Sequence, residues 1–188
     1  YAISPSPEAL SALNDAYGHL DDAQGQYRTT MRLAAANPAE AEALHRRALS
    51  LVKEPQQALE ALESLLARHP GDEALYAKGL VAYAALGRVG ELISLHEKYA
   101  KATGGSAAAR ALLSAANLAE HELHEGQRAY QLKQAAHEAD PDDLAAAEAL
   151  LAEARARGDR ERVEGVLVKL VALTSDEGRA AELKLELA

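Results

Sequence analysis

The chain has 188 residues, of which 44 are Ala and 30 are Leu, against seven Tyr, one Met and no Phe, Trp or Cys. Because Ala and Leu favour helices while the β-branched and aromatic residues of strands are scarce, this composition excludes a mainly β fold. The net charge of −9 and the lack of a continuous basic stripe predict that nucleic acid is not a partner.

Cysteine is absent, so the chain has no disulfide frame and no thiolate metal site, and bacterial cytoplasm and periplasm both stay open as compartments. The excess of Arg over Lys and the richness in Ala favour a bacterial origin. The most apolar stretch, residues 74–95, is interrupted by Lys78, Arg88 and Glu91, which predicts no membrane insertion. The start at Tyr1, followed by a Ser/Pro run, suggests a processed protein or a piece of a longer one.

Helix-breaking residues recur along the chain at intervals of 32, 34, 37 and 34 residues, at Pro38, Pro70, Gly104, Pro141 and Ser175. A second breaker follows each proline after seventeen residues, so each repeating unit splits into two helices. This spacing predicts five helical hairpins and one last helix, at residues 7–20, 23–36, 38–52, 55–68, 72–86, 88–102, 106–124, 126–139, 142–157, 159–173 and 176–187.

The residues next to these breakers have the chemistry of helix ends. Small polar residues suited to cap helix N-termini stand at Ser6, Asn37, Asp72, Ser106, Asp142 and Ser175. Gly87 and Gly158 suit helix C-termini because glycine readily adopts positive φ. Apolar residues recur at three- and four-residue steps, as at Leu59, Leu62 and Leu66, so each helix has one buried stripe.

This pattern resembles the tetratricopeptide repeat (TPR) family over nearly the whole chain. In the first helix of the third unit, Tyr76 and Tyr83 occupy the family's bulky and aromatic positions, and Leu80 replaces its small residue. The second helix of the preceding unit matches at Ala58, Leu62, Leu65 and Pro70. The resemblance implies an all-α fold, an α-solenoid of stacked antiparallel helical hairpins with about eleven helices. It also implies a single domain, 1–188, with five repeats at about residues 7–38, 39–71, 72–105, 106–142 and 143–175 and a last helix at 176–187.

Three departures from the family pattern carry expectations of their own. Gln26 and Thr30 stand at apolar positions of the first unit, so we expect its second helix to be partly solvated, as in a terminal repeat. Lys133 replaces a large apolar residue in the fourth unit. The last helix has no partner helix, and we expect Leu183 and Leu187 to lie over the fifth unit.

TPR arrays bind peptide segments in a concave groove lined by the first helices of their hairpins. The resemblance therefore implies a non-catalytic scaffold or adaptor that binds a peptide or helix of a partner protein, and self-association through the same groove stays open. The alternative is a ligand- or peptide-sensing regulatory domain of a larger enzyme or transcription regulator. Placing the repeats in register predicts the groove residues Asp15, His19, Ala77, Lys78, Val81, Ala84, Ala111, Leu118, Glu148, Ala152 and Arg155.

Other constellations favour plain structural interpretations. No phosphate-binding loop or nucleophile motif is present, so we expect no enzymatic activity and no cofactor. His121 and His124 are expected to share one helix face, yet an extra solvated turn of the long fourth unit explains them better than a metal site does. The mixed charges of residues 155–162 indicate a solvated turn, with an anchor for an acidic partner segment as the alternative.

Overall fold

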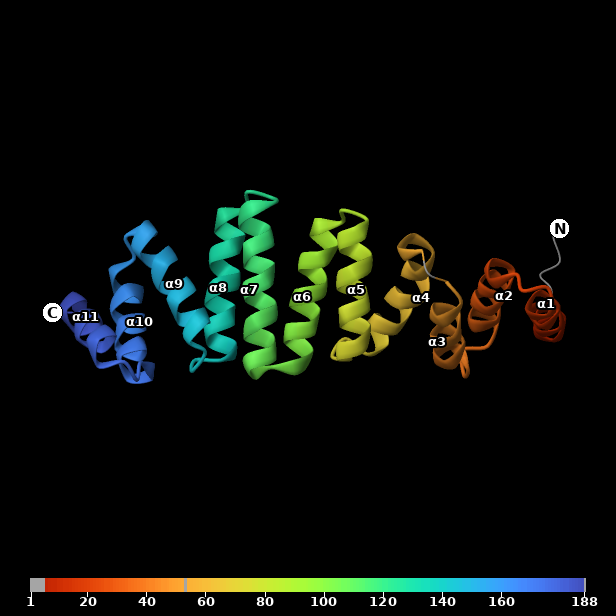
Figure 1. Ribbon diagram of the computed structural model, residues 1–188, viewed down its shortest axis with the longest axis horizontal. Coiled ribbons are helices and arrows are strands. Elements are labelled where there is room, and N and C mark those ends of the chain that lie inside the picture. Colours follow the sequence, from red (N-terminus) through yellow and green to blue (C-terminus); the bar gives the residue numbers. More distant parts are fainter. Residues whose placement is uncertain (1–5, 53, 188) are drawn as a thin grey trace. The chain divides into compact units, whose positions relative to one another are not determined.

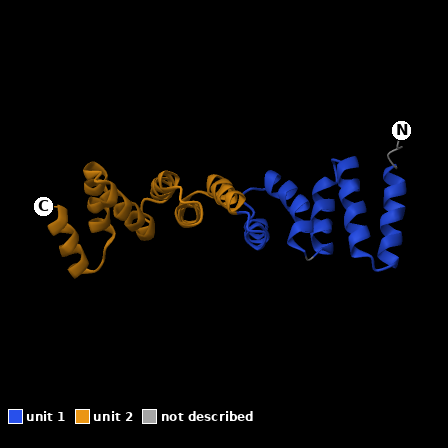
Figure 2. Ribbon diagram, turned by 90° about the horizontal axis from the view of Figure 1, so that it is seen from above, with its two compact units in different colours: residues 1–88 blue, residues 89–188 orange. Residues whose placement is uncertain are grey.

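The computed structural model describes residues 6–52 and 54–187. Within these residues the chain forms eleven α-helices and no strand, so the prediction of an all-α fold is confirmed (Figure 1). The chain divides into two compact units, residues 1–88 and 89–188 (Figure 2). The continuity of one solenoid across both units, with five repeats, stays a prediction.

Each unit is a run of TPR-like antiparallel helices in which every helix packs against the next one along the chain. The first unit consists of α1 (Pro7–His19), α2 (Ala23–Ala36), α3 (Ala41–Leu51), α4 (Pro55–Arg68) and α5 (Glu73–Ala85). The second consists of α6 (Val89–Thr103), α7 (Gly105–His121), α8 (Gly126–Ala139), α9 (Leu144–Arg157), α10 (Arg160–Leu173) and α11 (Glu177–Leu187).

Several predicted helix ends are confirmed in atomic detail. The Ser6 hydroxyl accepts a hydrogen bond from the Ala9 amide at 3.3 Å, and one Asp72 carboxylate oxygen accepts from two amides of α5 at 3.0 Å. Gly87 and Gly158 have φ values of 65° and 68°, in the left-handed region that favours glycine.

Other predicted caps are wrong, because a turn separates the breaker from the helix that follows it. Asn37 ends α2, and α3 begins only at Ala41, after the turn that holds Pro38. The aspartates one residue later, Asp143 and Asp176, accept the capping hydrogen bonds. Asp142 and Ser175, the predicted caps, do not accept these hydrogen bonds. The predicted cap Ser106 lies inside the first turn of α7.

The long fourth unit has a different end from the one predicted. Helix α7 has 17 residues but stops at His121, so the expected continuation to residue 124 is wrong. The amides of Leu123 and Glu125 donate to carbonyls of the last turn of α7, at 3.3 and 2.8 Å, and satisfy its free acceptors. His124 follows with a φ of 57°, so it and His121 do not share a helix face.

The cores of both units are built from Ala and Leu. In the first unit Ala61 and Leu65 have no exposed surface, and in the second unit Ala116 and Ala129 have none, beside the equally buried Ile93. Small side chains let neighbouring helices approach closely while the larger ones fill the space between them. Both units therefore bury continuous stripes, in which Tyr27, Tyr83, Tyr99 and Tyr130 are the buried aromatic side chains.

The hairpin of α1 and α2 is held by buried polar groups, which corrects the expectation of a solvated α2. Thr30 is fully buried, although Gln26 keeps some exposure. The Asn14 side-chain amide, 2% exposed, lies 3.1 Å from the Thr29 hydroxyl and 3.0 Å from the Thr30 hydroxyl. Hydrogen bonding within the hairpin therefore replaces the hydration that the polar residues predicted.

Candidate functional site: an apolar groove in the first unit

One face of α5 is exposed and almost entirely apolar. Ala77, Lys78, Val81 and Ala84, all predicted groove residues, lie on this face. Val81, in the middle of the helix, has 68% of its surface exposed. An exposed apolar stripe of this kind indicates an interaction surface when it borders a concavity.

The α5 stripe borders a groove of about 480 Å³ between α3 and α5, with α4 as its floor. This volume falls in the range of pockets that hold part of a ligand. Eight of the nine lining side chains are apolar, and Lys78 is the ninth. The lining consists of Leu49, Val52, Pro55, Ala58, Leu62, Ala77, Lys78, Val81 and Ala82.

Ion pairs tie α3 to the start of α5 and to the turn before it. Arg46 lies 3.3 Å from the Glu42 carboxylate and 3.6 Å from the Asp72 carboxylate, and Glu42 lies 3.0 Å from His69. The backbone amide of Leu75 lowers the pKa of Asp72, and the close approach of His69 lowers the pKa of Glu42. Both carboxylates are therefore ionised at neutral pH, and Arg46 is neutralised within the protein.

Lys78 differs from Arg46 in having no such partner. Among residues 6–52 and 54–187, no carboxylate lies within 4.0 Å of its ammonium group. The groove thus combines apolar walls with one solvated positive charge on the α5 side. A ligand that fits it buries apolar side chains and offers a hydrogen-bond acceptor or an anion to Lys78.

Sequence reasoning missed the floor and the α3 wall of this groove. Leu49 and Val52 lie at the end of α3, and Ala58 and Leu62 belong to α4. The family resemblance directs attention to first helices alone, while the matched pattern assigns Ala58 and Leu62 to packing. Pro55, which separates two apolar helices, was the signal available in the sequence.

The other predicted groove residues lie elsewhere. Asp15 and His19 are exposed on α1, and Glu148 and Ala152 are exposed together on α9. Leu118 is half-buried. Ala111 is only 3% exposed, so its placement on a surface is wrong. The exposed stripe of α7 runs one residue earlier, through Arg110, Ser114 and Asn117.

Arg155 is exposed as predicted, yet it already has an internal partner. Its Nε donates to Glu186 of α11 at 2.7 Å, and its Nη2 contacts the same carboxylate. Leu183 of α11 is 2% exposed and packs into the core of the second unit, as expected, whereas Leu187 stays 37% exposed. Helix α11 therefore packs on the hairpin of α9 and α10, and the Arg155–Glu186 ion pair joins it to α9.

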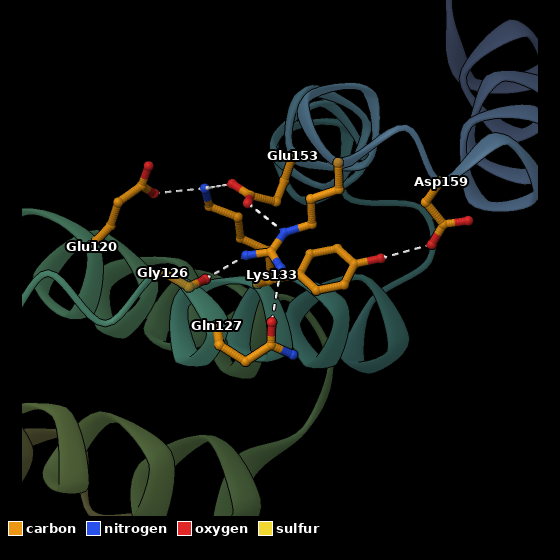
Figure 3. Close-up of polar contacts among 8 residues, drawn as sticks. Glu120, Gly126, Gln127, Lys133, Glu153 and Asp159 are labelled. Carbon is orange, nitrogen blue, oxygen red and sulfur yellow. Dashed lines mark hydrogen bonds and ion pairs between the residues drawn. The ribbon is translucent and has the colours of Figure 1, made fainter.

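A second polar cluster explains Lys133, the residue that departs from the family pattern. Its ammonium group lies 2.7 Å from Glu120 of α7 and 3.0 Å from Glu153 of α9 (Figure 3). Burial lowers its pKa and the two carboxylates raise it, with a net rise, so Lys133 is charged at neutral pH. The ion pairs join three consecutive helices of the second unit.

Arg157 extends this cluster. Its guanidinium donates to Glu153 at 2.7 Å and to Gln127 and the Gly126 carbonyl at 2.8 Å each. It also stacks on the Tyr130 ring, 4.4 Å from the centroid. The arginine-rich turn is therefore partly a packing element of the second unit, and Arg157 is not an open anchor for an acidic partner.

Among the described residues, no three His, Cys, Asp or Glu side chains gather closely enough to hold a metal ion. None of the helices in the described ranges combines the length and the hydropathy that a bilayer crossing requires.

The chain resembles solved helical-repeat structures. The crystal structure of MamA matches with 15% identity over 96% of this chain and 99% of that chain, at a TM-score of 0.45. MamA 41-end from Desulfovibrio magneticus RS-1 matches with 15% identity over 92% and 97%, at 0.40. A Podosopora anserina putative kinesin light chain with nearly identical TPR-like repeats matches with 17% identity over 90% and 97%, at 0.40. No family model and no curated protein matches the sequence. The likeness to these structures is one of fold alone.

Proposed function

We propose that this chain is a non-catalytic interaction module that binds an apolar segment of a partner protein in the groove between α3 and α5. The observation that carries the proposal is the exposed apolar face of α5, with Val81 at 68%, beside a groove of about 480 Å³. Contiguous exposed apolar surface beside a concavity is typical of interaction sites, whereas single exposed apolar side chains are common. In this role the chain acts as a scaffold or adaptor, as the five-repeat interpretation also suggests.

Binding in this groove is driven by desolvation of its walls. Large apolar side chains of the partner displace water from Leu49, Val52 and Val81 while resting on the α4 floor. The ion pairs of Arg46 hold α3 and the start of α5 in place, so little ordering is needed when the partner binds.

The test is selection of ligands from a phage-displayed library of random peptides on the full chain, followed by affinity measurements with the enriched peptides as synthetic probes. Val81→Glu should weaken binding by more than about tenfold, because it places a charge where apolar side chains must be desolvated. Val81 is exposed, so the variant should fold as the wild type does, which circular dichroism and melting temperature check.

Val168→Glu is the matched control. Val168 is also an exposed helical valine, at 55%, but it lies on α10, outside the groove. We expect its affinities to stay within twofold of the wild type. Failure to enrich any peptide, or enriched peptides that bind the Val81→Glu variant as tightly as the wild type, contradicts the proposal.

A further inference from the structure

We infer that the groove selects partner segments carrying a single acidic side chain beside their apolar anchors, and that Lys78 reads this acid. The inference rests on the proposed function of the groove and adds the chemistry of its ligand. It starts from the fact that Lys78 is the one charged residue among the described residues that line the groove.

The position of Lys78 makes its charge available to a ligand. It lies in the same stretch of α5 as Ala77 and Val81, with the latter one turn further along the helix, and all three are exposed. Glu54 and Glu63 are the acidic residues nearest in sequence to the groove lining, and neither forms an ion pair with Lys78 within the described ranges; Glu63 lies 3.8 Å from Arg88 instead. A bound apolar segment would exclude water around the ammonium group, which strengthens its interaction with an acceptor on the ligand.

Arg46 differs from Lys78 because its charge is already paired within the protein. Arg46 of α3 is already bound to the carboxylates of Glu42 and Asp72. Of Arg46 and Lys78, Lys78 on the α5 side is therefore the residue that can pair with an acid on the ligand. This fixes the side on which the acid must stand relative to the apolar anchors, which rest against Leu49 and Val52.

The charge of the whole chain limits the number of acids. With a net charge of −9, the protein repels polyanionic ligands at long range. In a ligand with a run of acidic residues, one acid is attracted by Lys78 while the others are repelled by the negative charge of the protein. One carboxylate within contact distance benefits from Lys78, because repulsion from more distant charges is screened over about 8 Å at physiological ionic strength. The ligand class is an apolar segment with one acidic residue.

The test is peptide selection on three forms of the full chain: wild type, Lys78→Glu and Lys78→Met. Wild-type selection should enrich Asp or Glu next to large apolar residues, Lys78→Glu should enrich Lys or Arg there, and Lys78→Met should enrich neither. Changing the acid of an enriched peptide to Lys should weaken wild-type binding roughly two- to fivefold, the range for exposed ion pairs, and strengthen binding to Lys78→Glu.

The two claims fail separately. If Val81→Glu abolishes binding while the charge next to the anchors is the same in all three selections, the acid preference is wrong and the groove function stands. If Val81→Glu leaves binding intact, the groove function is wrong, and the inference falls with it. Loss of the acid preference in Lys78→Met, with apolar anchors retained, is the result that supports both.

Discussion

Two lysines of this chain, each in the middle of a helix, have opposite surroundings. Lys133 of the second unit is 9% exposed and lies between two carboxylates, whereas Lys78 of the first unit is exposed beside an apolar groove. In the second unit the positive charge of Lys133 is paired with carboxylates of α7 and α9, so it joins three helices. In the first unit the positive charge stays exposed, where the proposed function makes it available to a ligand.

The difference separates charge that joins helices within a unit from charge that stays exposed beside an apolar surface. In the second unit Lys133 and Arg157 both pair with carboxylates, and Arg157 also stacks on Tyr130. Their charges are therefore compensated within the protein. The Lys78 face presents a charge and apolar walls together. Changes in the free energy of unfolding test how far buried and exposed groups differ in this chain.

Acidification should destabilise the chain through a buried histidine of the second unit. His96 is 5% exposed, and burial lowers its pKa from 6.5 to about 4. Below pH 6.5 the unfolded chain binds a proton that the folded chain refuses, so stability falls as the pH drops and the loss reaches about 3 kcal/mol near pH 4. Urea unfolding of wild type and His96→Gln between pH 7 and pH 4 measures it. Equal losses in the two proteins would exclude His96 as the cause.

Removing the buried lysine should cost stability, whereas removing the exposed one should not. Lys133→Met leaves Glu153 without one of its cationic partners in a half-buried site, and we expect a loss of about 2 kcal/mol. Lys78→Met should change the free energy of unfolding by less than about 0.5 kcal/mol. Urea unfolding of both variants at pH 7 decides the matter, and equal effects would erase the contrast between the two sites.

A smaller effect concerns the helix ends. Gly158→Ala should destabilise by about 1 kcal/mol, because Gly158 has a φ of 68° while an added Cβ would meet no neighbouring atom. Gly165 of α10 is the matched control, also with open space at its Cβ but inside a helix. Gly165→Ala should stabilise by roughly 0.5 to 1 kcal/mol. Thermal unfolding of the two variants should therefore shift in opposite directions.

The sequence predicts most of the helices because periodicity and breakers are local signals. All eleven expected helices exist, and the errors lie in the connections, where Pro38 sits in a turn and the turn after α7 begins at Glu122. Those ends depend on which amide and which carbonyl meet in three dimensions. Spacing along the chain does not determine that choice.

The candidate site was only half predictable. The exposed stripe of α5 follows from helical periodicity, so Ala77, Lys78 and Val81 could be named from the sequence. The groove itself needs Leu49 and Leu62 from two other helices, and its existence depends on how far α3 and α5 stand apart above α4. The difference between exposed Lys78 and paired Lys133 likewise depends on the carboxylates of Glu120 and Glu153, which lie 13 and 20 residues from Lys133 in the sequence.

The most direct test of the central claim is methyl NMR of the full chain, with labelled Leu and Val, during titration with an enriched peptide. The account predicts that the methyl signals of Leu49, Val52 and Val81 shift on binding. Leu144 and Val168, exposed apolar residues of the second unit, should keep their positions. Shifts confined to the second unit, with the groove methyls unchanged, would contradict the account.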